Sequence, residues 1–560
     1  MSELKKHTLK EMLQRSAELY PNRPALSWVD GKPNRYLDVK DQVQEISLLL
    51  HQNGIIKGDR VALLSENSPN WGIAYLSITS MGAIVVPILT DFQDNEIQHI
   101  LRHSACKAIF VSEKFYGKLD ISAPNRLRIL LENFSIIPPE TTKERLNNII
   151  NTGPKEFAKF KESALKMTGL ISQDVQEDDI ASIIYTSGTT GHSKGVMLTH
   201  KNLVFDAVAT LKIQDMNEHD KLVSVLPLPH TYECTVGFIL PFMQGAAVYY
   251  LDKPPVARVL LPAMQKIKPT MMLTVPLIIE KIFKTKIQPT FTKSAILHIL
   301  YKMPIFRKIL HKAAGNKLYQ SFGGKLHFFG IGGALLSPET EQFLRDAKFP
   351  YAIGYGLTET SPLIAGCTPS VTRYRSTGTV LPDLQVKIEK KDPSHKEGEI
   401  LVKGDTIMKG YYKDPERTKE VFTEDGWFKT GDLGTLTKDN YLYIKGRLKN
   451  VIIGPSGENI YPEELEAIIG ENDYVLESLV YDFDGKIAAR IHLNYELLDE
   501  QHKGVKTSTM EKVIANLLQE IKQQVNARVA QFSRITKVIE QPEPFTKTPT
   551  KKIKRYLYTS

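Results

Sequence analysis

The amino-acid sequence predicts an α/β protein with two domains, and three patterns along the chain support that prediction. Short apolar runs alternate with helical stretches up to about residue 378, short strands separated by turns follow, and a new pattern begins near Lys449. A chain of 560 residues is too long for one hydrophobic core. We therefore expect a large N-terminal domain of doubly wound sheets with a small barrel-like β piece, residues 1–448, and a small α+β C-terminal domain, residues 449–560.

The first pattern is typical of a parallel sheet with helices on both faces. Residues 8–20 are expected to form an amphipathic helix, with Thr8 and Glu11 as the two members of a capping box. Buried strands are expected at residues 61–64, 83–86, 108–111 and 180–185, and a helix is expected at residues 71–81.

The second and third patterns predict smaller units. Short strands at residues 385–388, 399–402, 435–436 and 441–444 indicate an antiparallel or barrel-like piece. Beyond Lys449, residues 463–469 open a helix, residues 479–481 and 487–493 make a hairpin around Asp484 and Gly485, and residues 510–529 form a long helix. This order of elements indicates a separate α+β domain.

Composition narrows the class of partner and the compartment. The formal net charge of +9 suits an anion, which could be a nucleotide, CoA, nucleic acid or anionic lipid. The three cysteines, Cys106, Cys234 and Cys367, are too far apart for a disulfide framework or a zinc motif, which indicates a reducing compartment. Residues 1–10 lack a signal-peptide core and no apolar run could span a membrane, so we expect a cytoplasmic protein.

The most informative segment is residues 185–195, Tyr-Thr-Ser-Gly-Thr-Thr-Gly-His-Ser-Lys-Gly. It follows an expected buried strand, and its glycines and hydroxyls allow several backbone N–H groups to face one anion, to which Lys194 adds a positive charge. The spacing differs from that of a Walker motif. We interpret the segment as a phosphate-binding loop, and the alternative is a flexible surface loop.

Four further segments, when they occur together, are typical of a nucleotide-binding site. The run Tyr-Gly-Leu-Thr-Glu-Thr at residues 355–360 offers a ring for a purine and a carboxylate for Mg²⁺, and Asp432 in Thr-Gly-Asp offers two acceptors to ribose hydroxyls. Residues 446–450 are placed like an interdomain linker, and residues 546–555 form a basic loop. Taken singly, each also fits an ordinary turn, a surface connection or a solvated tail.

In this order and at these separations, the motifs resemble the adenylate-forming superfamily of acyl-CoA synthetases, adenylation domains and luciferases, over roughly residues 8–556. Within it the chain looks most like long-chain fatty acyl-CoA synthetases, because residues 226–233 have the His-x-Tyr-Glu form of that branch, which residues 269–281 also resemble. The resemblance implies an AMP-forming ligase in which a fatty carboxylate attacks the α-phosphate of ATP and the thiol of CoA then attacks the acyl-adenylate. Mg²⁺ would be the cofactor, with ATP and CoA as co-substrates.

The resemblance also assigns the nucleotide site residue by residue. The phosphates would lie against Thr186, Ser187, Gly188, Thr189, Thr190 and Lys194. Thr358 would contact the α-phosphate, and Glu359 with Thr190 would bind Mg²⁺. Adenine would lie between Tyr355 with Gly356 and a wall made of Gly332, Gly333 and Ala334, and the ribose would lie against Asp432 and Arg447.

The mobile C-terminal lid carries the remaining expected groups. Lys552 would be the catalytic lysine of adenylation, and its neighbour Lys551 stands where many family members have glycine, which leaves Lys551 as the alternative. Lys449 would be the hinge of the lid, and Gly457, Glu458 and Asn459 would form the loop that lines the pantetheine tunnel of CoA.

The acyl pocket is expected around His230, with Tyr232, Thr235 and Val236. The alternative for His230 is a core histidine. A second expectation concerns residues 281–325, in which basic and apolar residues alternate and which could lie on the inner face of an anionic membrane. The alternative for this stretch is a solvated helical insertion, and its basic residues are Lys281, Lys284, Lys286, Lys293, Lys302, Arg307, Lys308, Lys312, Lys317 and Lys325.

Three other functions remain open from the sequence. The acyl group could pass to a holo acyl carrier protein instead of CoA, or the acid could be an aryl or shorter-chain carboxylate. A basic nucleic-acid or membrane-binding module is the alternative from another class, but the chain has no nucleic-acid-binding signature, so we expect small-molecule substrates and no nucleic acid.

Overall fold

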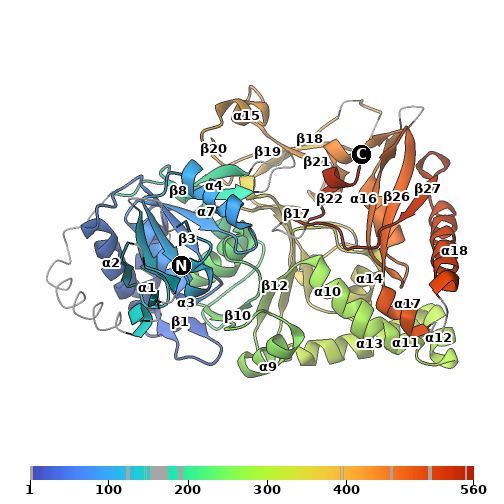
Figure 1. The fold of residues 1–560 in the computed structure, drawn as a ribbon, viewed down its shortest axis with the longest axis horizontal. Helices are drawn as coiled ribbons and strands as arrows, with labels where there is room; N and C mark the ends of the chain where they lie inside the picture. The colour runs from blue at the N-terminus through green and yellow to red at the C-terminus, as the bar shows by residue number, and fades with distance from the viewer. Residues whose placement is uncertain are drawn as a thin grey trace.

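The computed structural model describes residues 4–120, 126–139, 141–143, 145–146, 148–151, 174–186, 193–390, 392–394, 396–454, 458–501, 507–548 and 552–559. Two large sheets form the N-terminal part, and the C-terminal unit, orange to red in Figure 1, lies at the opposite end of the molecule. Six residues of the predicted site lie outside the described ranges: Ser187, Gly188, Thr189, Thr190, Gly457 and Lys551.

The first sheet has eight strands in the order β20-β9-β8-β4-β3-β5-β6-β7. Its middle, from β8 to β6, is parallel, and β7, β9 and β20 add antiparallel strands at the two sides. The strands are β3 (Arg60–Leu64), β4 (Ile84–Ile88), β5 (Ala108–Val111), β6 (Leu127–Leu130), β7 (Ile136–Ile137), β8 (Ile180–Thr186), β9 (Lys194–Thr199) and β20 (Gly410–Tyr411). The four predicted buried strands of this region are confirmed.

The second sheet has seven strands in the order β14-β13-β12-β10-β11-β1-β2, all parallel except the β1–β2 pair. They are β1 (Pro24–Trp28), β2 (Asn34–Arg35), β10 (Lys221–Ser224), β11 (Ala247–Tyr250), β12 (Met271–Thr274), β13 (Phe328–Ile331) and β14 (Tyr351–Ile353). The helix α3 (Pro69–Ser80) contacts β1 of this sheet and β3 and β4 of the other. Because α3 is apolar on nearly all sides, it can be buried between two sheets.

The remaining N-terminal helices connect and cover these strands (Figure 1). At the start of α1, Thr8 Oγ1 accepts the Glu11 N–H at 3.1 Å, as predicted, but the Thr8 N–H donates to Lys6 O at 2.9 Å. The second hydrogen bond of the predicted capping box, from the Thr8 N–H to the Glu11 side chain, is therefore wrong, because the Thr8 N–H donates to a backbone carbonyl instead. The helices are α1 (Leu9–Leu19), α2 (Tyr36–Gln52), α4 (Asp94–His103), α5 (Glu113–Tyr116), α7 (His200–Leu211), the π-helix η1 (Tyr232–Ile239), α8 (Leu240–Met243), α9 (Ala257–Ile267), α10 (Pro276–Ile282), the π-helix η2 (Phe283–Ile287), α11 (Gln288–Thr292), α12 (Ala295–Lys302), α13 (Pro304–Ser321) and α14 (Pro338–Asp346).

The small β piece is present as predicted, and all of its strand pairs are antiparallel. A bridge between Thr379 and Tyr441 joins its two sheets. The first sheet contains β15 (Tyr355–Gly356), β16 (Leu363–Gly366) and β17 (Thr379–Val380), and the second contains β18 (Gln385–Glu389), β19 (Gly398–Lys403), β21 (Phe428–Leu436) and β22 (Leu442–Arg447). The helix α15 (Pro415–Glu420) follows β20.

The C-terminal unit has its own core, in which α16 and α18 cover a three-stranded sheet. The predicted hairpin turn is present, with Asp484 at φ 53° and Gly485 at φ 72°, as a two-residue turn of this kind requires. The elements are β23 (Ile452–Ile453), β24 (Asn459–Ile460), α16 (Pro462–Ile469), β25 (Val475–Phe483), β26 (Lys486–Leu493), α17 (Tyr495–Gln501), α18 (Thr507–Asn526) and β27 (Lys537–Glu540). In the described part of the chain, no helix combines the length and apolar character needed to cross a membrane.

Candidate active site

Turns that follow β13 and β14 bring the predicted adenine residues together. The Gly332 N–H donates to Thr274 O at 3.1 Å, and the Gly354 N–H donates to Ile331 O at 2.9 Å, so the two turns lie side by side. Ligands of open parallel sheets bind at this carboxyl edge of the strands. Gly332, Gly333 and Ala334 thus lie on the turn beside the one that leads to Tyr355 and Gly356.

Tyr355 is joined to the predicted ribose residues. Its hydroxyl donates to Asp432 Oδ2 at 2.7 Å, and Arg447 Nε donates to Asp432 Oδ1 at 2.8 Å across the β21–β22 pair. Burial raises the pKa of the Asp432 carboxyl, and the Arg447 cation opposes that rise. The sequence predicted all three residues, and the structure places them in one polar cluster.

A second cluster joins the predicted phosphate and magnesium residues. Lys194 Nζ lies 2.6 Å from Glu359 Oε1 and 2.6 Å from the Tyr411 hydroxyl, which itself donates to Glu359 Oε1 at 2.9 Å. Although burial alone would raise the pKa of Glu359, the Lys194 cation holds it below its usual value. Thr358 precedes Glu359 on the same short helical turn, η3 (Thr358–Thr360).

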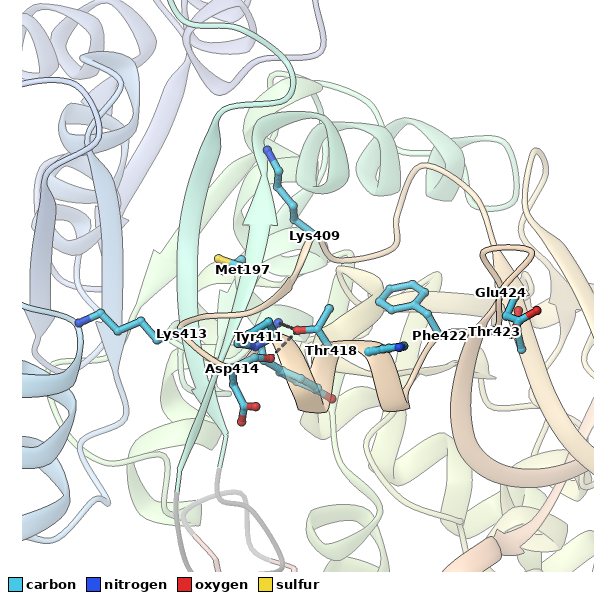
Figure 2. A pocket seen from close by; sticks show the side chains of 11 residues that line it. Met197, Lys409, Tyr411, Lys413, Asp414, Thr418, Phe422, Thr423 and Glu424 are labelled. Carbon is cyan, nitrogen blue, oxygen red and sulfur yellow. Dashed lines mark hydrogen bonds between the residues drawn. The ribbon is translucent and has the colours of Figure 1, made fainter.

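Tyr411 is a member of this cluster that the sequence analysis did not identify. Figure 2 shows it between β9 and α15, beside a surface pocket, where its N–H donates to Thr418 Oγ1 at 2.9 Å. Asp414 caps α15 by accepting the Arg417 N–H at 3.1 Å, so the helix that holds Tyr411 is itself fixed. The only sequence signal was an aromatic pair after Gly410, which is too common to single out.

The predicted phosphate loop begins at the end of β8 and ends at the start of β9. Thr186 and Lys194 face each other across this antiparallel pair. The Thr186 hydroxyl is buried and has no hydrogen-bond partner among the described residues, which is unusual for a buried polar atom. An anion between the two strands would give it a partner. The residues predicted between Thr186 and Ser193 lie outside the described ranges.

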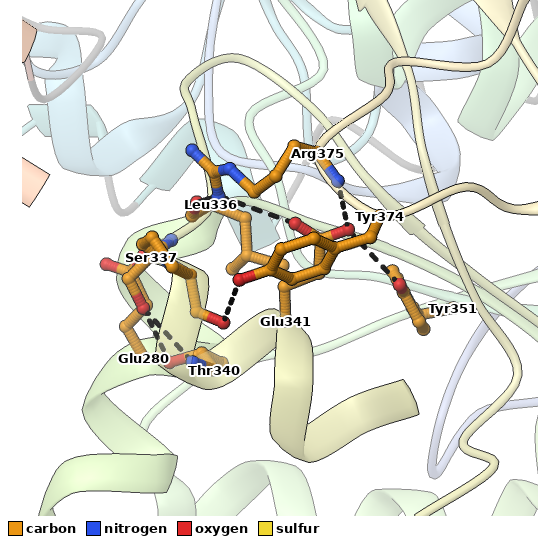
Figure 3. A network of polar contacts seen from close by, with 9 residues as sticks. Glu280, Leu336, Ser337, Thr340, Glu341, Tyr351, Tyr374 and Arg375 are labelled. Carbon is orange, nitrogen blue, oxygen red and sulfur yellow. Dashed lines mark hydrogen bonds and ion pairs between the residues drawn. The ribbon is translucent and has the colours of Figure 1, made fainter. Parts of the chain in front are cut away.

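A buried polar network fixes the turn that leads from the predicted adenine wall to α14. Figure 3 shows two hydrogen bonds of Arg375: its guanidinium donates to Leu336 O, and its backbone N–H donates to Glu341 Oε1 at 2.9 Å. The Ser337 N–H donates to Glu280 Oε1 at 2.6 Å, which ties the same turn to α10. The turn is therefore anchored on both sides, and the sequence analysis predicted none of these anchors.

Lys552 lies on a short hairpin formed by the C-terminal loop. Its N–H donates to Thr548 Oγ1 at 3.1 Å, and its carbonyl accepts the Thr548 N–H at 2.7 Å. Lys552 keeps access to solvent. Limited hydration and the Arg447 cation lower the pKa of Lys552, and Asp432 and Glu359 partly offset that effect.

Four cations therefore lie close enough to influence one another: Lys194, Arg447, Lys449 and Lys552. Limited hydration and the cations Arg447, Lys194 and Lys552 lower the pKa of the Lys449 ammonium to about 8. Among their acidic neighbours, Glu359 is paired with Lys194 and Asp432 with Arg447. Positive charges held this close without full compensation favour the binding of a polyanion.

His230 lies near Lys552 and next to an apolar cluster that contains Tyr232. The Tyr232 N–H donates to His230 Nδ1 at 3.2 Å, so the neutral ring carries its proton on Nε2. Burial and Lys552 lower the pKa of His230 to about 4, which keeps it neutral near pH 7. The Tyr232 ring packs on Gly332, where an added Cβ would lie 3.1 Å from the ring. The cluster around Tyr232 contains Val225, Leu226, Val236, Leu273, Val275, Ile278 and Phe328.

Thr235 differs from the other predicted pocket residues. It is fully buried, and its hydroxyl donates to Ser361 O at 2.7 Å. Thr235 therefore holds the segment after Glu359 against η1. Val236, by contrast, lies in the apolar cluster with Tyr232, as expected of a pocket wall.

Contacts with the N-terminal part hold the C-terminal unit where Lys552 lies near Arg447, Asp432 and Glu359. Lys284 of η2 donates to Gly470 O and, at 3.3 Å, to Val475 O, and Gln288 donates to Asp473 Oδ1 at 2.7 Å. Lys449 lies on the linker turn η5 (Leu448–Asn450). Asn459 lies on the strand β24, which pairs with β23, and Glu458 O accepts the Gly454 N–H at 2.8 Å in the same hairpin.

Comparison with known proteins identifies the family. A family profile described as AMP-binding enzyme matches residues 13–412, which is the greater part of the chain. This chain is an AMP-binding enzyme. The match covers the two large sheets, the phosphate-loop strands and Glu359, and it ends one residue after Tyr411.

Curated relatives of this AMP-binding enzyme include acyl-CoA and aryl-CoA ligases. A putative acyl-CoA synthetase of Bacillus subtilis, YngI, is 27% identical over 85% of this chain and 85% of its own length. Long chain acyl-CoA synthetase 1 of Arabidopsis thaliana is 30% identical over 88% of this chain and 80% of its own length. 4-Coumarate–CoA ligase 2 of Solanum tuberosum is 28% identical over 96% of this chain and 90% of its own length.

Solved structures share the fold of the AMP-binding enzyme over nearly its whole length. An anthranilate CoA ligase, AuaEII, in complex with anthranoyl-AMP has a TM-score of 0.77 at 20% identity and covers 98% of this chain and 96% of its own. An o-succinylbenzoate CoA synthetase of Bacillus subtilis in complex with ATP and a magnesium ion has a TM-score of 0.71 at 22% identity over 97% of this chain and 98% of its own. At this identity the likeness confirms the predicted α/β fold.

The residues of the AMP-binding enzyme suit a magnesium ion that is shared with a nucleotide. Mg²⁺ usually takes one or two protein carboxylates and fills its other positions with water and phosphate oxygens. Glu359, which pairs with Lys194, supplies such a carboxylate. The Thr186 hydroxyl, which has no partner among the described residues, lies on β8 opposite Lys194 of β9. Among the described residues, no group of three or more His, Cys, Asp or Glu forms a ready-made metal cage. This donor set fits a metal that arrives with its substrate.

Glu233, the last residue of the His-x-Tyr-Glu segment, is buried in η1. Its Oε1 accepts the Ser224 hydroxyl at 2.5 Å, and its carboxyl packs on Gly237. Burial raises the pKa of Glu233 to about 8, so the group is largely a neutral acid near pH 7. Its place in the structure is that of a neutral anchor for η1, which carries Tyr232 and Val236 into the apolar cluster.

Glu233→Gln should therefore make stability less dependent on pH. Since the carboxyl keeps its proton in the folded state up to about pH 8 and loses it near pH 4.5 when unfolded, the free energy of unfolding of the wild type falls between those values as pH rises. Glutamine cannot ionise, so this fall should be reduced. Thermal midpoints measured between about pH 5 and 8 test this, with Glu18→Gln on the exposed face of α1 as the control. Parallel curves for wild type and Glu233→Gln would contradict a neutral Glu233.

Proposed function

We propose that this AMP-binding enzyme is an AMP-forming ligase that joins a long-chain fatty acid to CoA through an acyl-adenylate. The observation that carries the proposal is that Lys194, Arg447, Lys449 and Lys552, which come from both parts of the chain, lie near one another around Glu359 and Asp432. An acid that attacks ATP brings one anion against a polyanion, so the reaction needs positive charge held in place before the substrates meet.

In the proposed first step, ATP lies along the carboxyl edge of the second sheet. Adenine lies between Tyr355 and the Gly332–Ala334 turn, and the ribose hydroxyls bind Asp432 and Arg447. Lys194 leaves Glu359 for the β- and γ-phosphates, which frees the Glu359 carboxylate for Mg²⁺. Bound there, Mg²⁺ would neutralise phosphate charge, and Thr190 is its second proposed protein ligand.

The acid then lies between the apolar cluster and the α-phosphate. His230 Nε2–H is available to donate to the carboxylate, because Nδ1 already accepts the Tyr232 N–H. Lys552 lies beyond His230, close enough to lower its pKa, so it can bridge the attacking oxygen and the α-phosphate together with Thr358. Attack forms the acyl–phosphate bond, and pyrophosphate leaves with the electron pair.

For the second step we propose that the C-terminal unit, residues 449–560, turns about Lys449. Loss of pyrophosphate removes much of the negative charge that holds Lys552 at the proposed site. Rotation would withdraw the hairpin and bring the Gly457–Glu458–Asn459 loop to the site, where the thiol of CoA attacks the acyl carbonyl and AMP leaves. A few loop residues are enough for such a hinge.

The acid that we propose as substrate is a long-chain fatty acid. The apolar cluster around Tyr232 supports a long alkyl chain, as do the relatives named long chain acyl-CoA synthetases. The aromatic rings of Tyr232 and Phe328 in the same cluster favour an aryl acid as the second candidate, in line with the 4-coumarate ligases. Transfer to a holo acyl carrier protein is the alternative second step.

A series of acids from acetate to stearate, with 4-coumarate, separates these candidates. Each buried methylene adds about 0.8 kcal/mol, so kcat/KM should rise by up to about fourfold per methylene until the chain fills the pocket. Thioester formation with ATP, Mg²⁺ and CoA is measured by mass spectrometry, and holo carrier protein replaces CoA in a parallel series. A maximum at 4-coumarate or a flat series would overturn the long-chain assignment, and product on the carrier alone would change the acceptor.

A further inference from the structure

The helical hairpin α12–α13 has an outer face that nothing in the described chain covers. Four of the five most exposed large apolar side chains of the described residues lie on it, with exposed fractions of 74% for Ile305, 72% for Ile296, 63% for Ile299 and 58% for Ile309. Met303 and Phe306 lie between them and are also exposed. Scattered apolar residues are common on surfaces, but six within one hairpin mark an interaction site.

These residues are not needed to pack the hairpin. Its inner face is fixed separately, since the Phe291 and Tyr301 rings stack at 4.8 Å and the Tyr301 hydroxyl lies 3.1 Å from His311 Nε2. His311 Nδ1 pairs with Asp346 of α14 at 2.9 Å. The hairpin is therefore held to the body from within, and the outer isoleucines stay free to contact something else.

The charged side chains of the segment that contains this hairpin have one sign. Residues 281–338 contain ten Lys and Arg and no Asp or Glu. This segment has a formal charge of +10, whereas the whole chain has +9, so the rest of the protein is close to neutral. Lys284 is engaged with the C-terminal unit, but Lys293, Lys302, Lys308 and Lys312 of the hairpin are exposed.

We propose that the outer face of α12–α13 docks on an anionic lipid bilayer. A helix pair that exposes isoleucine and phenylalanine beside lysines can bury the apolar side chains at the headgroup boundary while the lysines reach the lipid phosphates. A protein partner fits less well, because protein interfaces are depleted in lysine. The helices lie flat on the surface, since neither could span the membrane.

The position of the hairpin would bring the membrane close to the apolar cluster around Tyr232. α10, η2 and α11 connect the hairpin to β12. Val275, which follows β12, and Ile278 of α10 both lie in the apolar cluster. In Figure 1 the hairpin lies beside the C-terminal unit, which Lys284 and Gln288 contact. A bilayer on this face would place the apolar cluster near dissolved apolar acids. The docking itself does not depend on which acid the enzyme activates.

Sedimentation of the full chain with vesicles tests the proposal. Vesicles of phosphatidylcholine with about 30% phosphatidylglycerol should bind the wild type at least about tenfold more strongly than phosphatidylcholine alone, and salt should weaken the binding. The variant Lys302→Glu, Lys308→Glu, Lys312→Glu should lose about tenfold or more. The control Lys32→Glu, Lys253→Glu, Lys438→Glu has the same net charge with lysines exposed elsewhere and should bind like the wild type. Equal loss in both variants, or no binding by the wild type, overturns the proposal.

A second variant tests the apolar half of the face. Ile296→Ser, Ile305→Ser, Ile309→Ser should reduce vesicle binding at unchanged net charge, and an unchanged thermal midpoint shows that the fold is intact. Because the three native cysteines are buried, Ile305→Cys offers a selective labelling site, and an environment-sensitive dye there should shift to the blue with anionic vesicles. If the dye shifts only with protein concentration and sedimentation shows a dimer, the face binds a second copy of the chain and the lipid proposal is wrong.

Discussion

Replacing Lys552 by alanine should lower the rate of acyl-adenylate formation by about 10²–10³-fold. Lys552 is the only proposed catalytic cation that the C-terminal unit supplies. The substitution therefore removes positive charge from the place where negative charge develops, between the carboxylate and the α-phosphate. Both backbone groups of Lys552 are tied to Thr548, so alanine should leave the hairpin in place. ATP–pyrophosphate exchange measures the adenylation step, and thioester formation from supplied acyl-AMP should stay close to that of the wild type.

The same position offers a pH test. Because the surrounding protein and Arg447 lower the pKa of Lys552, the protonated form that the reaction needs should be lost below the pH at which an ordinary lysine titrates. Lys552→Arg, which retains its charge, should move the alkaline limb of pyrophosphate exchange to higher pH. Lys551→Ala is the neighbouring control and should keep most of the activity. If Lys551→Ala loses exchange and Lys552→Ala does not, the roles of the two lysines are reversed.

Local patterns predicted the fold because each pattern has a local physical cause. The apolar runs that became β3, β4, β5 and β8 are buried on both faces, so composition alone marks them. The turn at Asp484 and Gly485 needs two positive φ values, which those residue types tolerate. The order of the strands within each sheet depends on contacts between distant segments, such as β1 beside β11, and no local pattern records them.

The site was predicted where a motif carries its own chemistry. The pairs Lys194–Glu359 and Asp432–Arg447 join residues that separate motifs had supplied, and the fold confirms their proximity without testing their roles. Residues that act by holding others in place were missed. Tyr411, Arg375 and Glu341 have common residue types in unremarkable contexts, and only the folded chain shows that they fix Glu359 and the turn after the adenine wall.

The position of Lys552 depends on an ion pair elsewhere in the C-terminal unit. Arg555 is three residues further on, and its Nη2 donates to both carboxylate oxygens of Glu466 of α16, at 2.7 and 2.6 Å. Its Nη1 donates to Val480 O at 3.1 Å. Burial raises the pKa of Glu466, and the Arg555 cation opposes that rise. The pair therefore fastens the base of the hairpin to the core of the unit, and the Lys554 N–H, which donates to Thr546 O at 2.9 Å, transmits that attachment toward Lys552.

Arg555→Ala should lower the free energy of unfolding of the C-terminal unit by about 3 kcal/mol, because it leaves a largely buried carboxylate without its partner. The hairpin would then lose its fixed place, and pyrophosphate exchange should fall although Lys552 is still present. Arg534→Ala, at an exposed site of the same unit, should change neither quantity. The double variant Arg555→Met, Glu466→Leu should regain most of the stability, since replacing both charges removes the unpaired one. Chemical denaturation measures the loss of stability. If Arg555→Ala is as stable as the wild type, the ion pair is not needed, and the hydrogen bonds within the hairpin are enough to position Lys552.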